Sequence, residues 1–300
     1  MIICHEQLGM NPLQSSRSNP QGTPSGITPA ATTATVRVTP PPTVQRLALG
    51  LEYCGAAYRG WQSQQAGVPT VQSHVEAALS RVANHPVSVV CAGRTDAGVH
   101  ALEQVVHFDT SAQRRLRGWV LGANTQLPED IAVLWACRMP LDFHARYAAL
   151  ARRYRYIILN RPARPGLDRQ RVSGHFQPLD AERMHQAGQH LLGEHDFSAF
   201  RARHCQSRTP WRCVHELQVW READRVLIEI EANAFLHHMV RNIVGVLMVI
   251  GRGEQPVVWA KQVLASRDRT QAAITAPAAG LYLQAVRYPA HYAVSPEFCS

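Results

Sequence analysis

Apolar and polar residues alternate from about residue 46, where the folded part of the chain is expected to begin. Every second position from Leu47 to Tyr53 is large and apolar or aromatic, which is typical of a half-buried strand. Apolar residues at helical spacing follow Thr70, a residue type that caps helix N-termini, and predict a helix to about Val82. We further expect strands at 86–92 and 103–109, a helix at about 112–121 and a strand at 131–138. This order, β-α-β-β-α-β, is that of a ferredoxin-like fold.

The same order returns in the second half of the chain. We expect a strand at 154–159, a helix at 180–192, strands at 213–220 and 225–231, a helix at 235–250 and a strand at 281–287, with one additional helix near 257–266. The sequence therefore predicts an α+β fold of two ferredoxin-like halves, 45–148 and 149–290. We expect the halves to join into one extended mixed sheet, with the helices on one side and a central cleft.

The two ends of the chain depart from this pattern. Residues 1–44 are rich in Pro, Thr, Ser, Gln and Asn, so we expect a disordered extension, and we expect a short tail at 291–300. The N-terminus lacks a positive run followed by an apolar core, which argues against a secretory signal. The most apolar stretch, Met239–Ile250, contains Arg241 and is shorter than the roughly 20 residues of a membrane span.

The net charge of the chain indicates which class of molecule it binds. Lys and Arg number 31 against 22 Asp and Glu, a formal net charge of +9. Such a chain favours a polyanionic partner, and nucleic acid is preferred to a membrane because no basic amphipathic helix stands out. The seven cysteines form an odd set without framework spacing, so we expect reduced thiols in a cytoplasmic protein.

The segment Cys91–Gln104, CAGRTDAGVHALEQ, carries the most distinctive chemistry. Continued strand alternation would place Arg94 and Asp96 on one side of the chain, close enough to form an ion pair. Such a pair lowers the pKa of an Asp by roughly 1–3 units, so Asp96 would be ionised and able to act as a nucleophile or base. Gly93 and Gly98 would allow a sharp turn or the close approach of a ligand. The alternative is an Asp that folds onto its own loop beside a solvated Arg.

Two other segments hold candidate binding residues. The strand pattern ARRYR at 151–155 places Tyr154 opposite Arg153 and Arg155, and aromatic rings among arginines suit RNA, because a base stacks on an aromatic ring for roughly 1–3 kcal/mol. An ordinary edge strand would show the same pattern. Arg241 lies in an apolar helix and needs a partner, because a lone buried charge is costly. We predict Asp96 as that partner; a purely structural ion pair is the alternative.

Several strings of residues resemble one family. GRTDAGVHA, around Asp96, is similar without gaps to the active-site signature of the tRNA pseudouridine synthase A family. The resemblance runs from about Leu47 to Tyr288 and includes RYRYI at 153–157, FHAR at 143–146, QSRTPWR at 206–212, NAFLHHMVRNIVG at 233–245 and GLYL at 280–283.

This resemblance implies the pseudouridine synthase fold and a homodimeric isomerase that converts uridine to pseudouridine in the anticodon stem-loop of tRNA, without cofactor or metal. It implies that Asp96 is catalytic and that Tyr154 stacks on the target uracil and is a proposed base for its carbon-5 proton. It further implies that Leu281 contacts the uracil edge and that Arg241 lies near Asp96. Arg94 would orient Asp96 and fill the space of the extruded nucleotide. Whether Asp96 attacks the sugar carbon or removes a sugar proton stays open.

Three rival interpretations have weaker support. A non-catalytic RNA-binding protein of two RRM-like halves would show an RNP motif, and we find none in the sequence. A nucleotide-phosphate enzyme would show GxxxxGKS or GxGxxG, and the sequence contains neither motif. A zinc site would need better spacing, since CxxC and HExxH are absent and the neighbours His204 and Cys205 would point apart in a strand. The same doubt applies to His237-His238. We expect an RNA-facing loop to contain Arg201, Arg203, Arg208, Trp211 and Arg212, rather than a zinc site formed with Cys213 and His215.

Overall fold

The computed structural model describes residues 44–65 and 67–294, and ten strands of these residues form one mixed sheet. The predictions for residues 1–43 and 295–300 lie outside the described residues. The first half contains β1 (Gln45–Tyr53), α1 (Val71–Ala83), β2 (Val90–Cys91), β3 (His100–Thr110), α2 (Leu116–Asn124) and β4 (Ile131–Met139). The second half contains β5 (Ala151–Asn160), α3 (Ala181–Gln189), β8 (Trp211–Glu222), β9 (Arg225–Ala232), α4 (Met239–Gly251) and β10 (Leu281–Arg287).

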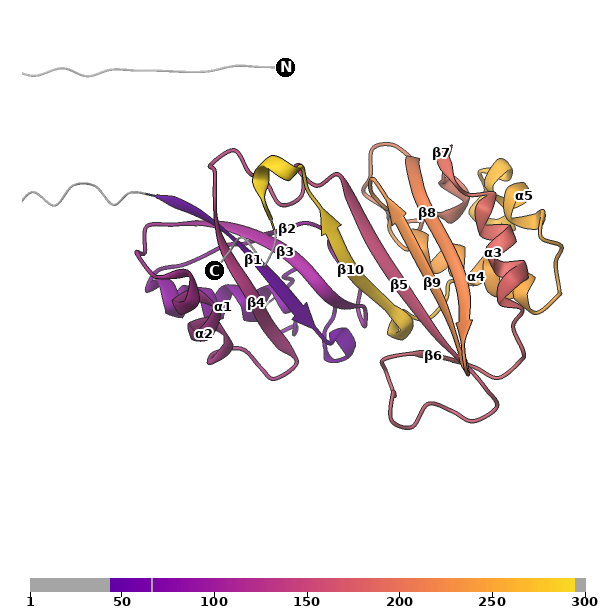
Figure 1. The fold of residues 1–300 in the computed structure, drawn as a ribbon, viewed down its shortest axis with the longest axis horizontal. Helices are drawn as coiled ribbons and strands as arrows, with labels where there is room; N and C mark the ends of the chain where they lie inside the picture. Colours follow the sequence, from indigo (N-terminus) through magenta and orange to yellow (C-terminus); the bar gives the residue numbers. More distant parts are fainter. Residues whose placement is uncertain (1–43, 66, 295–300) are drawn as a thin grey trace, which may run out of the picture. The chain divides into compact units, whose positions relative to one another are not determined.

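The two halves repeat one strand order, as predicted. The main path of the sheet is β4-β1-β3-β10-β5-β9-β8-β7, and β2 pairs with β3 beside it (Figure 1). In each half the strands therefore lie in the order fourth, first, third, second, which is the ferredoxin-like arrangement. The helix α5 (Trp259–Ser266) is additional, as expected, whereas the short strands β6 (Ser173–His175) and β7 (Gly193–Asp196) were not predicted.

The edge of β3 is shared between two partners, and this sharing joins the halves. Near its C-terminal end β3 pairs with β2, where Val90 lies opposite His107. At its start β3 pairs in parallel with β10, where Tyr282 lies opposite His100. We predicted a strand over 86–92, but β2 has only two residues, and the chain then leaves the sheet as a loop of residues 92–99. This Asp96 loop lies between β2 and the place where β10 takes over the edge of β3.

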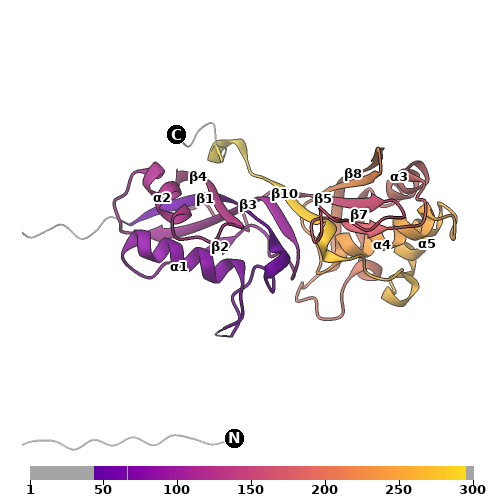
Figure 2. The same ribbon diagram turned by 90° about the horizontal axis from the view of Figure 1, so that it is seen from below.

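The helices cover one face of the sheet, as predicted. One continuous core contains buried side chains from α1 to α5 together with one face of the strands, for example Leu47 and Leu49 of β1. Figure 2 shows α1, α4 and α5 on the same side of the strands. On β1, Ala48 points to the opposite face, where a smaller cluster packs against Phe143 and Ala145 from the segment between β4 and β5.

Local signals of the sequence appear at their expected places. The Thr70 side chain accepts a hydrogen bond from the N–H of Ser73 at 3.4 Å and caps α1. Among the described helices, none is long and apolar enough to cross a bilayer. Cys54, Cys91, Cys205 and Cys213 are free thiols, as expected for these four residues.

Candidate active site

The Asp96 loop is held by side chains from two strands. Gln104 of β3, fully buried, donates to the carbonyl of Gly93 at 2.5 Å and accepts from the N–H of Gly93 at 3.3 Å. Arg152 of β5 donates to the carbonyl of Ala92 at 2.9 Å. Buried backbone groups require such partners, since an unpaired one costs free energy. The loop is therefore fixed to both halves of the protein just before Asp96.

The two glycines of the loop serve different needs. Gly98 has φ of +78°, a conformation that side-chain-bearing residues rarely adopt, so it allows the sharp turn that we predicted. Gly93 has no positive φ, and a Cβ there would lie 3.7 Å from the Tyr154 hydroxyl. A side chain at 93 would therefore extend toward Tyr154, and the glycine keeps that space open.

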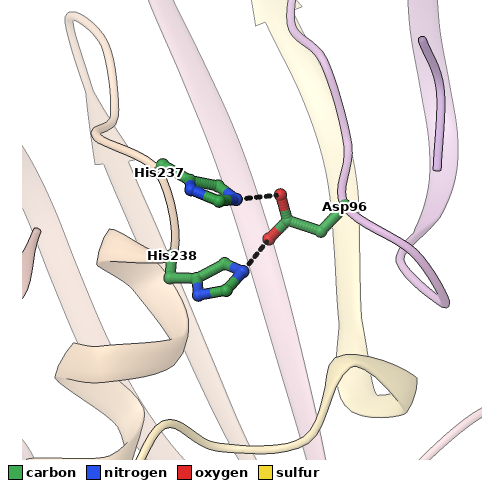
Figure 3. Close-up of side chains that lie close together, drawn as sticks. All are labelled: Asp96, His237 and His238. Carbon is green, nitrogen blue, oxygen red and sulfur yellow. Dashed lines mark ion pairs between the residues drawn. The ribbon is translucent and has the colours of Figure 1, made fainter. Parts of the chain in front are cut away.

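Three side chains from the start of α4 meet the Asp96 carboxylate. His237 Nε2 lies 3.2 Å from Oδ1, and His238 Nε2 lies 3.3 Å from Oδ2 (Figure 3). Arg241 Nη1 lies 3.5 Å from Oδ2. The Asp96 side chain is 26% exposed, so the carboxylate is held in place and still reachable. The predicted pairing of Arg241 with Asp96 is confirmed.

The backbone of His238 explains how two neighbouring imidazoles face one carboxylate. Neighbouring side chains of an extended strand point to opposite sides, but His238 adopts a left-handed conformation with φ 61° and ψ 6° at the N-cap of α4. Burial lowers the pKa of His238 below its ordinary value, although Asp96 acts in the opposite direction. The lowered pKa favours a neutral imidazole for His238, whose Nε2 lies beside the Asp96 carboxylate.

Arg241 is also tied to the backbone beyond α4. Its Nε donates to the carbonyl of Ala276 at 2.8 Å, and the N–H of Ala276 donates to the carbonyl of Arg241 at 3.1 Å. This reciprocal contact leaves Nη1 directed at Asp96. Arg241 therefore sets the position of the carboxylate relative to the second half of the protein.

The predicted ion pair between Arg94 and Asp96 is wrong. No ion pair joins these two residues, and Arg94 is exposed. The prediction assumed that strand alternation continues to residue 96, but β2 ends at Cys91 and the chain turns at Gly93 and beyond. The positive partner of Asp96 is Arg241, and Arg94 is left free to contact a ligand.

Tyr154 and Leu281 lie beside Asp96 in the same cavity. Tyr154 is 8% exposed and packs edge-on against Phe235, with ring centroids 5.1 Å apart. Burial, and after it the negative charge of Asp96, raises the pKa of Tyr154 above its ordinary value. The ring is therefore a neutral phenol, which can stack on a base without carrying charge. Leu281, at the start of β10, is 5% exposed and adds an apolar surface.

The arginine side chains on the opposite face of β5 form ion pairs with neighbouring strands of the sheet. Arg153 lies 2.7 Å from Glu216 and 3.0 Å from Glu231, and Arg155 lies 2.5 Å from Glu229. Cross-strand carboxylates neutralise these two arginines, so their guanidinium groups are engaged within the sheet.

A cavity of about 1070 Å³ surrounds these residues. Asp96 is its one acidic lining residue among the described part of the chain, whereas six arginines line it. Arg59, Arg94 and Arg146 are exposed, and no described carboxylate forms an ion pair with them. The electrostatics of the cavity therefore favour an anion, and these three guanidinium groups without a carboxylate partner suit phosphates.

The loop before β8 is only partly as predicted. Arg201 donates to the carbonyls of Cys205 and Ser207, and Arg212 is buried and donates to the carbonyl of Thr209. These two arginines hold the loop together. Arg203, Arg208 and Trp211 are exposed and remain candidates for contact with RNA.

The sequence interpretation missed the roles of His237, His238 and Arg152. The two histidines were visible in the string NAFLHHMVRNIVG, but nothing in their spacing reveals a left-handed residue at 238. Asp96, His237 and His238 are the one group within the described residues that could hold a metal ion, with ligand atoms within 4.8 Å of one another. The rejected set of His204, Cys205, Cys213 and His215 does not form such a group.

Comparison with known proteins identifies relatives of this chain. A tRNA pseudouridine synthase A of Vibrio cholerae serotype O1 is 58% identical over 252 residues, covering 84% of this chain and 95% of that protein. The enzyme of the same name from Escherichia coli O1:K1 is 57% identical over 251 residues, covering 84% and 93%. A solved structure of a Cbf5-Nop10-Gar1 complex matches at a TM-score of 0.30 and 13% identity, over 67% of this chain and 45% of that one, which is too slight to carry an argument. The family model for tRNA pseudouridine synthase matches residues 51–148 and 187–289, and the chain belongs to this family.

Proposed function

We propose that this protein isomerises uridine to pseudouridine in the anticodon stem-loop of tRNA, with Asp96 as the catalytic residue. One observation carries the proposal: a reachable carboxylate is fixed from both halves of the protein in a cavity where all other charged lining side chains of the described residues are arginines or histidines. Membership of the tRNA pseudouridine synthase family supports the reaction, and the names of the relatives support tRNA as substrate.

The reaction balances without a cofactor. The bond between N1 of uracil and C1′ of the ribose breaks, and a bond between C5 and C1′ forms. The proton on C5 leaves, and N1 takes up a proton, so no electrons are gained or lost. The enzyme must therefore only hold the flipped nucleotide, assist bond cleavage at the sugar and move one proton.

Each of the side chains named above has a separate role in the proposed reaction. Asp96 acts on the ribose, either by attack at C1′ or by removal of a sugar proton. Tyr154 offers its ring to the uracil, and Leu281 contacts the uracil edge. The raised pKa of Tyr154 keeps its phenol protonated at neutral pH and therefore a poor base, so stacking is its main role. Arg241 keeps Asp96 in place.

Extruding a base costs a few kcal/mol, which contacts to the phosphates can offset. Arg59, Arg94 and Arg146 are placed around the cavity to make such contacts, and Arg94 is the candidate to occupy the space of the flipped nucleotide. We further propose that the protein acts in the cytoplasm as a homodimer, as the family resemblance implies; size-exclusion chromatography with light scattering tests the dimer.

The experiment for the proposed function measures tritium released to water from tRNA labelled at uracil C5. The protein should release label from tRNAs with uridines in the anticodon stem-loop. Asp96→Asn, which removes the charge and keeps the shape, should release none while binding tRNA in a filter assay with unchanged affinity.

The matched control is Asp142→Asn, an exposed carboxylate outside the cavity. It should release label at the rate of the unsubstituted protein. Absence of release from every tRNA, with binding intact, would instead support the RNA-binding alternative.

A further inference from the structure

The Asp96 carboxylate and two imidazoles form a set of donors that the proposed isomerisation does not need. His237 and His238 each point Nε2 at a different oxygen of Asp96, at 3.2 Å and 3.3 Å (Figure 3). The side chains of His237, His238 and Asp96 are 40%, 29% and 26% exposed, so an ion could reach them from the cavity.

The spacing of these donors suits a small divalent cation. Zn²⁺ binds imidazole nitrogen at about 2.0–2.1 Å and carboxylate oxygen at about 2.0–2.2 Å, so two ligand atoms of a tetrahedral site lie roughly 3.3–3.5 Å apart. The observed separations from Asp96 to the two histidines fall at or just below this range. Two imidazoles and one carboxylate also make a common donor set for Zn²⁺ that leaves a fourth position open.

The backbone conformation of His238 supports this arrangement of the donors. His238 is held in a left-handed conformation, which costs energy for a residue with a side chain and persists only where its surroundings enforce it. The arginines that line the cavity oppose a cation, and Arg241 does so most directly, because its guanidinium lies 3.5 Å from Oδ2 of Asp96. The same contact orients the carboxylate, as outer groups do for metal ligands. We therefore expect reversible binding and not a permanent structural ion.

We propose that Asp96, His237 and His238 bind a divalent cation of the Zn²⁺ type and that this binding switches the active site off. A carboxylate that coordinates the ion is withdrawn from the ribose, and the ion occupies the space of the target nucleoside. The cation and tRNA therefore exclude each other, and each weakens the binding of the other by the same factor. The inhibitory half of this proposal rests on the proposed function; the binding half does not.

The binding half is tested without tRNA. Co²⁺ is titrated into the full chain and followed by visible absorption, which is much stronger for a tetrahedral ion than for the hydrated one, and Zn²⁺ is then added as competitor. The expected result is one Co²⁺ per chain, displaced by Zn²⁺. The double variant His237→Ala/His238→Ala should bind at least about tenfold more weakly.

A control variant identifies the ligands. His204→Ala removes an exposed imidazole that lines the same cavity, and it should bind Co²⁺ like the unsubstituted protein. Circular dichroism verifies that each variant is folded. Equal Co²⁺ affinity in the double variant, or no tetrahedral spectrum in the unsubstituted protein, overturns the site.

The inhibitory half is tested by tritium release at increasing Zn²⁺. Release should stop as the site fills, recover on addition of a chelator, and need more Zn²⁺ when more tRNA is present. Full release at complete occupancy overturns the inhibitory role. If no tRNA releases tritium even without Zn²⁺, the proposed function and the inhibitory role fail together, and the Co²⁺ titration still decides the site.

Discussion

At the scale of single residues, Arg241 is the side chain that links Asp96 to the second half of the protein. It binds the carbonyl of Ala276 through Nε and faces Asp96 through Nη1. A lysine keeps the charge but cannot make both contacts in this geometry. For Arg241→Lys we therefore expect kcat to fall about 10²-fold with little change in KM for tRNA, because a misplaced catalytic group affects turnover more than binding.

The control for this prediction is Arg183→Lys. Arg183 of α3 also donates to backbone carbonyls, those of Ile250 and Gln255, but does not line the cavity. Its replacement should leave kcat unchanged. Equal losses in both variants would mean that general destabilisation, and not the position of Asp96, explains the effect.

The lowered pKa of His107 predicts how the free energy of unfolding depends on pH. Its Nδ1 accepts from the N–H of Ala145 at 3.1 Å, and burial, then His144 and Arg46, lowers its pKa from 6.5 to about 4. The unfolded chain therefore takes up a proton at a higher pH than the folded one. The contribution to stability is complete above pH 6.5 and is lost as the pH falls toward 4, by an amount on the order of 2 kcal/mol.

Urea unfolding between pH 7 and pH 4.5 measures this contribution. His107→Gln should unfold with a flatter pH dependence than the unsubstituted protein, whereas His204→Gln, at an exposed position, should not change the slope. Parallel curves for the unsubstituted protein and His107→Gln would show that His107 is not the titrating group.

The residues of the site show where sequence reasoning stops. Asp96, Tyr154, Arg241 and Leu281 could be named from their strings, and the structure brings all four to one cavity. The Arg94 ion pair was wrong because it assumed that an extended chain continues past Cys91. The contact of His237 and His238 with Asp96 depends on one left-handed residue, and the sequence pattern does not encode that conformation.

At the scale of elements, strands and helices set by local periodicity were predictable. The long helices and strands lie near their expected positions, and β10 has the predicted bounds 281–287. The length of β2 was not predictable, because it depends on β10, about 190 residues later, pairing with the start of β3. The strands β6 and β7 have three and four residues, too few for alternation to be visible.

The close packing of α4 on the segment before β10 gives a prediction at this scale. A Cβ on Gly245 would lie 2.2 Å from the carbonyl oxygen of Ile274, a backbone atom that cannot move cheaply. Gly245→Ala should therefore destabilise the protein by about 2 kcal/mol or more and lower Tm by roughly 4–8 °C. It should also lower kcat, because Ala276, which holds Arg241, lies in the displaced segment.

Gly118→Ala is the matched control, because Gly118 lies in α2, is exposed and has nothing within 4 Å of the added Cβ. Alanine favours a helix over glycine by up to about 1 kcal/mol, so Tm should rise slightly. Differential scanning calorimetry compares the two variants. A higher Tm for Gly245→Ala would contradict the packing argument.

At the scale of the whole molecule, the catalytic geometry depends on the joint between the two halves. Asp96 comes from the first half, and Tyr154, Arg241 and Leu281 come from the second. The joint contains the short parallel pairing of β3 with β10 and the hydrogen bonds from Arg152 to the Asp96 loop. Neither ferredoxin-like half contains the site by itself, so the site exists only where the two units meet.

The net charge of +9 predicts how substrate affinity responds to salt. If Arg59, Arg94 and Arg146 each contact a phosphate, binding tRNA releases counterions, and the affinity falls as a power of the salt concentration. Replacing all three by Ala should raise the Kd for tRNA and lower the slope of log Kd against log salt by about 3, one for each lost contact. The control is the variant Arg81→Ala, which removes an exposed arginine of α1 outside the cavity and should leave the slope within about 1 of the original.

Filter binding at several KCl concentrations measures both slopes. An unchanged slope in the triple variant would mean that tRNA is bound by another surface and that the cavity arginines do not hold its phosphates.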